Sequence, residues 1–321
     1  MQKGSLLKKG SKSALIAAIV NTVIAIVKGG AYLLTGNVAM FAETMHSFGD
    51  AANQFFVYIG SALSKKLPTD RYPNGFGRVV NLVLLGAVIV VGIMSYETIK
   101  EGIQHIFHPI ESTGILINIS VLSLGVILES YVLFKAMKEV LHETQIEAKG
   151  FSVITKSLGG LKRAKPATKL VFLEDSVATF GGLIAIIGIL LSYFAGYHAA
   201  EGIASIMIGI MMFFVVGKVF LDNARGVLGE TDDDLEESIA QLIYKHPEIK
   251  DIPELFAIRE GEDYHIEMKL EIDPSLTVAQ ALDIKNQIEG EINEIKGVTD
   301  VIIEFEKDDG IPSENHKLML E

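Results

Sequence analysis

Long apolar stretches dominate the first two thirds of the chain. A helix needs about 20 predominantly apolar residues to cross the hydrocarbon core of a bilayer. Six stretches reach this length, at roughly 13–35, 38–63, 79–104, 114–139, 168–195 and 199–222. The second stretch is the least apolar, because Glu43, His46 and Asp50 interrupt it. The pattern predicts an α-helical membrane protein with six transmembrane helices.

The apolar pattern becomes shorter after residue 222. Apolar positions at helical spacing predict helices at 232–245 and 277–294, and alternating positions predict strands at 254–260, 264–272 and 298–306. The order α-β-β-α-β indicates two helices on one face of a small sheet, a ferredoxin-like α+β domain. A domain of this size buries only a modest core, so pairing of two copies in a homodimer is expected.

Composition supports this division of the chain. Hydrophobic residues make up 49% of the chain and charged residues 21%, which fit together only if they are segregated. We therefore divide the chain into an N-terminal arm (1–12), a transmembrane domain (13–222) and a C-terminal domain (223–321). The net charge of −12 argues against nucleic acid as a partner, since phosphate binding requires clustered Lys and Arg. The absence of Cys excludes disulfides, thiolate metal ligands and cysteine nucleophiles.

Basic residues are concentrated in alternate connections. They lie in the N-terminal arm and in the loops after the second and fourth stretches, whereas the other loops have almost none. By the positive-inside rule both termini are cytoplasmic. The basic arm runs into the first apolar stretch with no cleavage site of small residues, so we expect this stretch to be a retained span. These features predict a multi-pass protein of the cell membrane.

Three ionisable residues lie on one stripe of the second predicted helix. Glu43, His46 and Asp50 are spaced i, i+3 and i+7, which places them on one helix face. Each ionisable residue within a span costs about 2.5–3.5 kcal/mol on insertion scales, so the stripe indicates a function. A neutral imidazole and a carboxylate four residues apart can share one divalent cation.

A second acidic pair interrupts the fifth predicted helix. Glu174 and Asp175 are adjacent and point about 100° apart, so only one can aim at the second helix. We favour Asp175 as the ligand, with Glu174 as its competitor. With His46 and Asp50 this set suits Zn²⁺, and also Mn²⁺, Fe²⁺ or Co²⁺.

Other polar residues within the spans have two readings each. Lys28 is expected to extend to the interface or to pair with an acid, and Asn53 to hydrogen-bond within the bundle or to support the metal. Glu129 fits a proton relay and a packing polar group equally well. The histidines at the end of the third helix, His105 and His108, are expected to be ordinary surface residues.

Three stretches resemble the cation diffusion facilitator family of metal/proton antiporters. They are Leu-Leu-Thr-Gly-Asn-Val-Ala at 33–39, Ala-Glu-Thr-Met-His-Ser-Phe-Gly-Asp at 42–50, and Glu-Gly-Ile-Ala-Ser at 201–205. The resemblance implies a homodimer with a transport site between the second and fifth helices. It also implies alternating access, in which metal moves outward against inward protons. Ligands must lose protons to bind metal, which makes such coupling physically sound.

The chain departs from the usual family pattern at three places. Val171 stands where a fourth ligand is usual, and Glu174 beside Asp175 resembles the branch that contains the animal mitochondrial zinc transporter. Tyr72 and Phe76 stand where the loop after the second helix usually has two His, so we expect no metal there. In the tail the usual ligands are replaced, and no binuclear zinc site is expected. The replacements are Lys269, Glu304 and Glu306.

Together these features predict a divalent cation efflux transporter that works by proton antiport and is not an enzyme. Zn²⁺ is the expected cargo and no cofactor is expected. Glu43, Asn53 and Glu129 are candidates for the pathway or for proton coupling. The alternatives are an exporter of Mn²⁺, Fe²⁺ or Co²⁺ and a membrane-anchored metal sensor. An intramembrane hydrolase lacks its usual His-Glu-x-x-His set, and a channel would conduct slowly past several carboxylates.

Overall fold

The computed structural model describes residues 6–161, 164, 166–261 and 263–313. The chain forms two compact units. The helical unit contains Lys9–Ser61 and Val83–Asp222, and the second unit combines Ala62–Leu82 with the chain from Asn223 onward and with the N-terminal residues.

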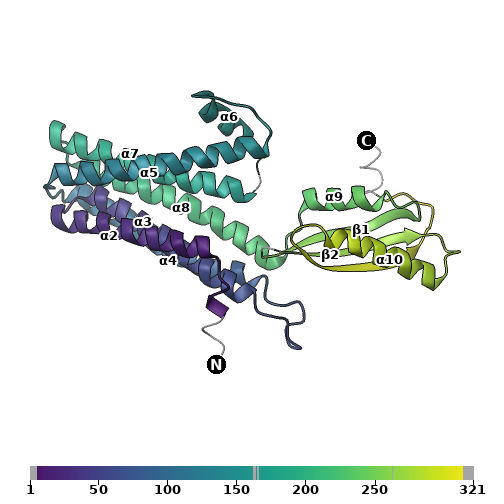
Figure 1. Cartoon of the computed structure of the whole chain (residues 1–321). Coiled ribbons are helices and arrows are strands. Elements are labelled where there is room, and N and C mark those ends of the chain that lie inside the picture. Colours follow the sequence, from purple (N-terminus) through teal and green to yellow (C-terminus); the bar gives the residue numbers. More distant parts are fainter. Residues whose placement is uncertain (1–5, 162–163, 165, 262, 314–321) are drawn as a thin grey trace. The chain divides into compact units, whose positions relative to one another are not determined.

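Six long helices build the membrane domain (Figure 1). They are α2 (Lys12–Thr35), α3 (Val38–Ser64), α4 (Val79–Phe107), α5 (Ile115–Glu143), α7 (Pro166–Ala195) and α8 (Ala199–Leu228). All except α3 are long and apolar enough to cross a membrane. Helix α3 has 27 residues, and its polar stripe lowers its hydropathy, as the sequence predicts. A short helix, α6 (Ser152–Gly160), lies between α5 and α7 in the stretch expected to be a loop.

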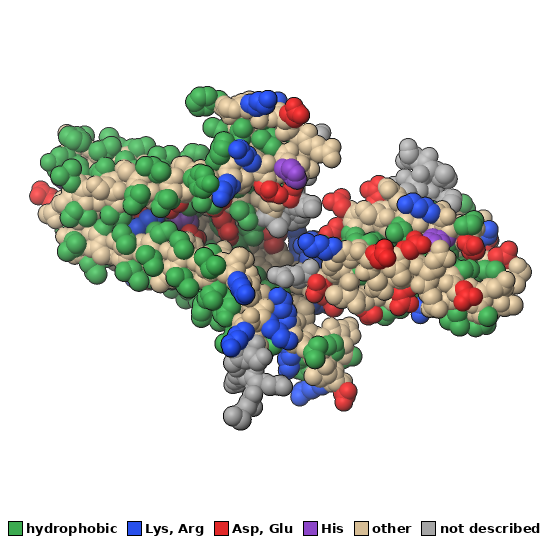
Figure 2. All heavy atoms as spheres, viewed as in Figure 1, with side chains coloured by type: hydrophobic (Ala, Val, Ile, Leu, Met, Phe, Trp, Pro, Cys, Tyr) green, Lys and Arg blue, Asp and Glu red, His purple; other side chains and the backbone are tan. Residues whose placement is uncertain are grey.

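The surface of the helical unit suits a lipid environment. Large apolar side chains cover much of its outside, as Figure 2 shows. On α2, for example, Ile16, Val23 and Ile26 are more than half exposed. Small residues instead lie inside, where Ala31, Ala39 and others let helices approach closely. This inversion of the usual pattern confirms the predicted membrane domain.

A tight hairpin joins α2 to α3. Gly36 has φ 66°, a left-handed conformation that glycine adopts without steric cost, and its N–H donates to the Tyr32 carbonyl. The Asn37 side chain then accepts from the Met40 N–H and caps the start of α3. The hairpin fixes the first two helices side by side in antiparallel orientation, which positions the polar stripe of α3 against α2.

The C-terminal unit has the predicted order α-β-β-α-β. Its elements are α9 (Asp233–Ile243), β1 (Ile249–Glu260), β2 (Asp263–Ile272), α10 (Val278–Asn293) and β3 (Val298–Lys307). Strand β2 is central, antiparallel to β1 and parallel to β3. Isoleucines from both helices and from the sheet, including Ile239, Ile266 and Ile288, form one core. The α+β prediction is confirmed, and β1 begins five residues earlier than predicted.

Candidate metal transport site

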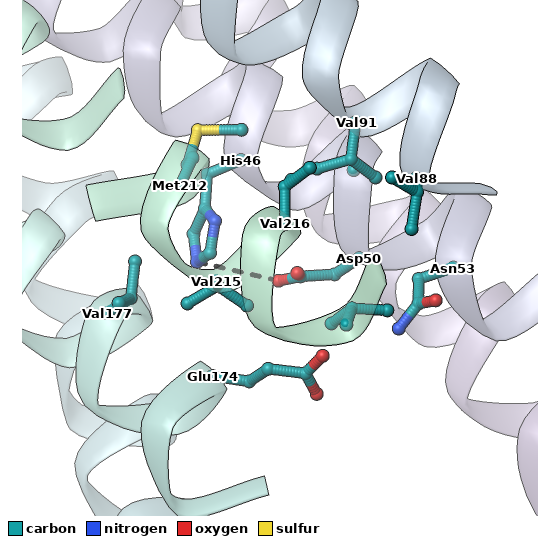
Figure 3. Close-up of a pocket in the computed structure, with 12 residues that line it drawn as sticks. His46, Asp50, Asn53, Val88, Val91, Glu174, Val177, Met212, Val215 and Val216 are labelled. Carbon is teal, nitrogen blue, oxygen red and sulfur yellow. Dashed lines mark ion pairs between the residues drawn. The ribbon is translucent and has the colours of Figure 1, made fainter. Parts of the chain in front are cut away.

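His46 and Asp50 lie one turn apart on α3 and face each other. The His46 Nε2 atom is 3.6 Å from Asp50 Oδ2. His46 is buried, with 6% of its surface exposed, whereas the Asp50 side chain is 41% exposed. Figure 3 shows the two side chains projecting from one helix toward each other. The predicted pair is therefore formed, with its carboxylate accessible and its imidazole enclosed.

A cavity that is partly open to solvent lies beside this pair, and the empty space in it, open solvent included, is about 450 Å³ (Figure 3). Four helices line it: α3, α4, α7 and α8. Its polar lining residues are His46, Asp50, Asn53 and Glu174. Its apolar lining residues are Val88, Val91, Val177, Met212, Val215, Val216 and Val219. Apolar walls lower the local dielectric, which strengthens the attraction between a cation and the carboxylates.

Helix α7 brings Glu174, and not Asp175, to the cavity. Glu174 lines the cavity, and Figure 3 shows its side chain extending toward the side on which Asp50 lies. Asp175 is absent from the lining, and its buried Oδ2 accepts no hydrogen bond from the described residues. In this arrangement Glu174 occupies the place that we expected for Asp175. The two side chains point in different directions, as neighbours on a helix must.

The four predicted ligands do not close around a single point. Within the described parts of the chain, no group of three or more His, Asp or Glu lies close enough to hold a metal ion. His46 and Asp50 are together, and Glu174 faces the same cavity from across it. A metal held by all three requires α7 to approach α3. The ligand set of His46, Asp50, Glu174 and Asp175 thus stays a prediction.

Glu43 lies on the same stripe as His46 but contacts different partners. Its Oε2 atom accepts a hydrogen bond from Lys28 Nζ at 2.8 Å, and Lys28 also pairs with Glu129 Oε1 at 3.2 Å. Glu43 is not among the residues that line the cavity. Of the two readings for Lys28, pairing with an acid is confirmed. The Lys28–Glu43–Glu129 cluster joins α2, α3 and α5.

A second polar contact inside the bundle was missed by the sequence patterns. His105 is buried, and its Nε2 lies 3.8 Å from Glu201 Oε2, so the expectation of a surface residue is wrong for His105. His108 is exposed, as expected. Glu201 also accepts a hydrogen bond from Ser112 at 2.8 Å. The signal that marks this contact is an acid in the first turn of α8, within the 201–205 motif.

The loop and tail positions at which the resemblance implies histidines have other contacts here. The rings of Tyr72 and Phe76 pack with centroids 5.2 Å apart, and Lys66 Nζ lies 4.2 Å above the Phe76 ring. In the tail, Lys269 Nζ lies 3.1 Å from Glu254 and 3.8 Å from Glu306. The hydrogen bond and charge of Glu254 raise the pKa of Lys269.

The fold and this site define a multi-pass membrane protein with an acidic, histidine-containing cavity and an appended α/β domain. Residues 14–228 match the family described as the cation efflux transmembrane domain, and residues 231–308 match the cation efflux protein cytoplasmic domain. These matches cover most of the chain. The protein belongs to the cation efflux, or cation diffusion facilitator, family, whose members are transporters and not enzymes. Its C-terminal domain is cytoplasmic.

Individual relatives are distant in sequence. The chain is 24% identical over 273 residues to the mitochondrial proton-coupled zinc antiporter SLC30A9 of Mus musculus, covering 83% of this chain and 46% of that protein. It is 22% identical over 315 residues to the cation-efflux pump FieF of Escherichia coli O139:H28, covering 97% of both. The chain spans about half the length of the mitochondrial relatives that it matches.

Proposed function

We propose that this protein exports divalent metal cations from the cytoplasm in exchange for protons, through a site built on α3 and α7. The observation that carries the proposal is the His46–Asp50 pair beside a cavity that Glu174 also lines. One imidazole nitrogen and two carboxylates suit a four-coordinate Zn²⁺, with water or Asp175 as the fourth ligand. Zn²⁺ is therefore the expected cargo.

The cavity lies near the middle of α3 and extends toward the cytoplasmic ends of α4, α7 and α8. Helix α8 leads into the cytoplasmic domain, so Val215 and Val219, in its second half, lie toward the cytoplasm. Val88 lies in the first half of α4, which begins on that same side. Access from this side is what an exporter needs when it loads its cargo. Alternating access then requires closure of this half and opening of the other.

A homodimer is part of the proposal. Among the described residues of the cytoplasmic domain, no helix or strand covers the face of the sheet opposite the two helices. On that face Phe256 of β1 and Ile302 of β3 are 43% and 51% exposed, and both are aligned with Glu267 of β2. Exposed apolar residues on an open sheet face are typical of an interface between copies.

The test is metal transport by the purified protein in liposomes. An imposed pH gradient should drive Zn²⁺ accumulation, with proton movement in the opposite direction. Asp50→Asn should reduce the metal affinity by at least about tenfold, because outer-shell changes alone cost about 10–100-fold. Asp222→Asn, at an exposed position of α8, is the matched control and should transport like wild type. Normal transport by Asp50→Asn would overturn the site.

The choice of metal is tested in the same liposomes. The donor set also accepts Mn²⁺, Fe²⁺ and Co²⁺, since affinity order does not by itself set selectivity. If Zn²⁺ is the cargo, each of the other ions should compete with Zn²⁺ only weakly. Stronger transport of Mn²⁺ or Fe²⁺ than of Zn²⁺ would reassign the cargo while leaving His46 and Asp50 as the site.

A further inference from the structure

A second charged cluster lies inside the membrane domain, apart from the cavity. Lys28 donates to Glu43 at 2.8 Å and to Glu129 at 3.2 Å. The Lys28 and Glu43 side chains are 2% and 1% exposed, and that of Glu129 is 19% exposed. Helices α2, α3 and α5 therefore meet at one ammonium group.

The charges of this cluster do not balance. Two carboxylates share one ammonium, which leaves one negative charge within the bundle when both are ionised. Glu43 Oε1 and Glu129 Oε2 are both buried, and neither accepts a hydrogen bond from a described residue. An uncompensated buried charge is strongly unfavourable in a membrane domain. One added proton on either carboxylate removes the excess charge and supplies the missing donor.

Two glycines of α7, Gly181 and Gly182, lie against the carboxylates of this cluster. A Cβ atom on Gly181 would lie 2.8 Å from Glu43 Oε1. A Cβ atom on Gly182 would lie 3.7 Å from Glu129 Oε2 and 3.9 Å from Glu43 Oε2. Both carboxylates therefore converge on the same short segment of α7, and the absence of side chains there leaves room for them.

We propose that Lys28, Glu43 and Glu129 form a proton-binding site that is separate from the metal site. The proton resides on the Glu43–Glu129 pair, and Lys28 supplies a fixed positive charge that holds the two carboxylates together. This inference rests on the proposed function, since it names the groups that carry the counter-ion of the metal. It differs from exchange at shared ligands, because no metal ligand has to be protonated.

The two sites are linked by the helices on which they lie. Glu43 precedes Asp50 by seven residues on α3, and Glu174 precedes Gly181 by seven on α7. Seven residues span about 10 Å along a helix and return to nearly the same face. A dication held at the metal site favours the ionised carboxylates at this distance, so metal binding expels the proton. An approach of α7 to α3 around the metal also moves Gly181 and Gly182 relative to the two carboxylates of the cluster.

The other charged groups near the cluster come from two helices. His46 of α3 and Asp175 of α7 both lie within electrostatic range of Glu129. Helix α8 presents the apolar Ile208 to Gly181. Among the described residues, no hydrogen bond or ion pair joins the cluster to His46, Asp50, Glu174 or Asp175. The effect of His46 and Asp175 on the cluster is therefore through space.

The test is the pH dependence of Zn²⁺ binding by the purified full-length protein, measured by calorimetry in buffers of different ionisation enthalpy. The amide variants Glu129→Gln and Glu43→Gln each leave Lys28 with one carboxylate, a neutral pair that keeps the packing. Each should release about one proton fewer per bound Zn²⁺ than wild type, and log Kd should depend less steeply on pH. Glu139→Gln, at an exposed position of the same helix α5, should match wild type.

The outcomes separate this inference from the proposed function. If wild type binds Zn²⁺ and both cluster variants release as many protons as wild type, the proton site is wrong and the metal site stands. If Glu139→Gln also releases about one proton fewer per bound Zn²⁺ than wild type, the effect is a general one of charge and the inference fails as well. If wild type binds no Zn²⁺, Mn²⁺, Fe²⁺ or Co²⁺, the proposed function itself fails. Agreement of the two cluster variants guards against a folding defect in one.

Discussion

Lys28 of α2 and Glu43 of α3 form an ion pair of 2.8 Å in which both side chains are almost fully buried. The two helices are joined by the hairpin at Gly36, so this pair also locks the register of the first two spans. Ion pairs inside a membrane domain rarely serve stability alone, because each charge must first be removed from water. The pair is therefore the point at which packing and function are most closely connected.

Replacing Lys28 by Met should destabilise the protein strongly. Removal of one partner from a buried ion pair costs about 3–5 kcal/mol, and here it leaves two carboxylates facing each other. Thermal unfolding of the detergent-solubilised protein should show a clear fall in the midpoint for Lys28→Met at neutral pH. Lys138→Met, at an exposed position of α5, is the matched control and should change little.

The same reasoning predicts a rescue. Glu43→Gln and Glu129→Gln together with Lys28→Met leave no charge in the cluster, so the triple variant should regain most of the lost thermal stability. A triple variant as unstable as Lys28→Met alone would show that the packing of the lysine stem, and not charge, sets the loss.

Helices α4 and α8 approach each other through two glycines. A Cβ atom on Gly202 would lie 2.6 Å from the Gly102 carbonyl oxygen, which no rotamer change can relieve. We predict that Gly202→Ala forces the helices apart and lowers the free energy of unfolding by about 1–3 kcal/mol. Gly92→Ala on α4 is the control, since its nearest atom is 4.0 Å away. Thermal unfolding in detergent measures both, and equal midpoints would refute the close approach.

Much of the architecture follows from local patterns in the sequence. Runs of apolar residues determine the long helices, and Gly36 with Asn37 determines the hairpin. Alternation of apolar residues determines the strands of the tail, where Ile266, Met268 and Leu270 face one core. These features depend on residues that are close in sequence, so reading the chain in order is sufficient.

The partners of the polar residues could not be predicted in the same way. Lys28 and Glu129 are 101 residues apart, and only the packing of α2 against α5 brings them together. The choice between Glu174 and Asp175 depends on the rotation of α7 about its axis, which periodicity leaves undetermined within about 100°. The burial of His105 could not be predicted for a related reason, since its partner Glu201 lies on another helix.

Asp232 anchors the start of the cytoplasmic domain and should make its stability depend on pH. It accepts hydrogen bonds from the Leu235 N–H at 3.2 Å and from the Tyr264 hydroxyl at 2.8 Å, and it pairs with Arg259 at 3.3 Å. Burial acts to raise the pKa of Asp232, but these hydrogen bonds outweigh burial and lower it. A lowered pKa in the folded state stabilises the fold above the pKa of the unfolded chain, near 3.9.

Asp232→Asn should therefore weaken the cytoplasmic domain at pH 7 by about 1 kcal/mol, because the hydrogen bonds with Tyr264 and Arg259 lose the charge of the carboxylate. The difference from wild type should shrink as the pH falls below about 4, through the lowered pKa of Asp232. Hydrogen exchange of the α9 amides in the full-length protein measures this opening. Asp283→Asn, exposed on α10, should behave like wild type, and a difference that persists at pH 2 would contradict the assignment.

Lys269 places a positive charge among the acidic residues of the cytoplasmic sheet. Its ammonium lies between Glu254 of β1 and Glu306 of β3, and Glu304 is the residue opposite it in the register of β3. The carboxylates on the two strands that flank β2 would otherwise repel one another or attract a metal ion. We predict that a chelator leaves the unfolding of the cytoplasmic domain unchanged, since the positive charge is covalently attached.

Substitution of this lysine tests the argument directly. Lys269→His replaces the ammonium by a metal-binding imidazole among carboxylates, so unfolding of the domain should become sensitive to Zn²⁺ and to chelators. Lys250→His, at an exposed position of β1, is the control and should show no such sensitivity. Differential scanning fluorimetry of the full-length protein, with and without Zn²⁺, reports both variants. Chelator-sensitive unfolding of wild type would instead mean that metal ions, and not Lys269, balance these acidic residues.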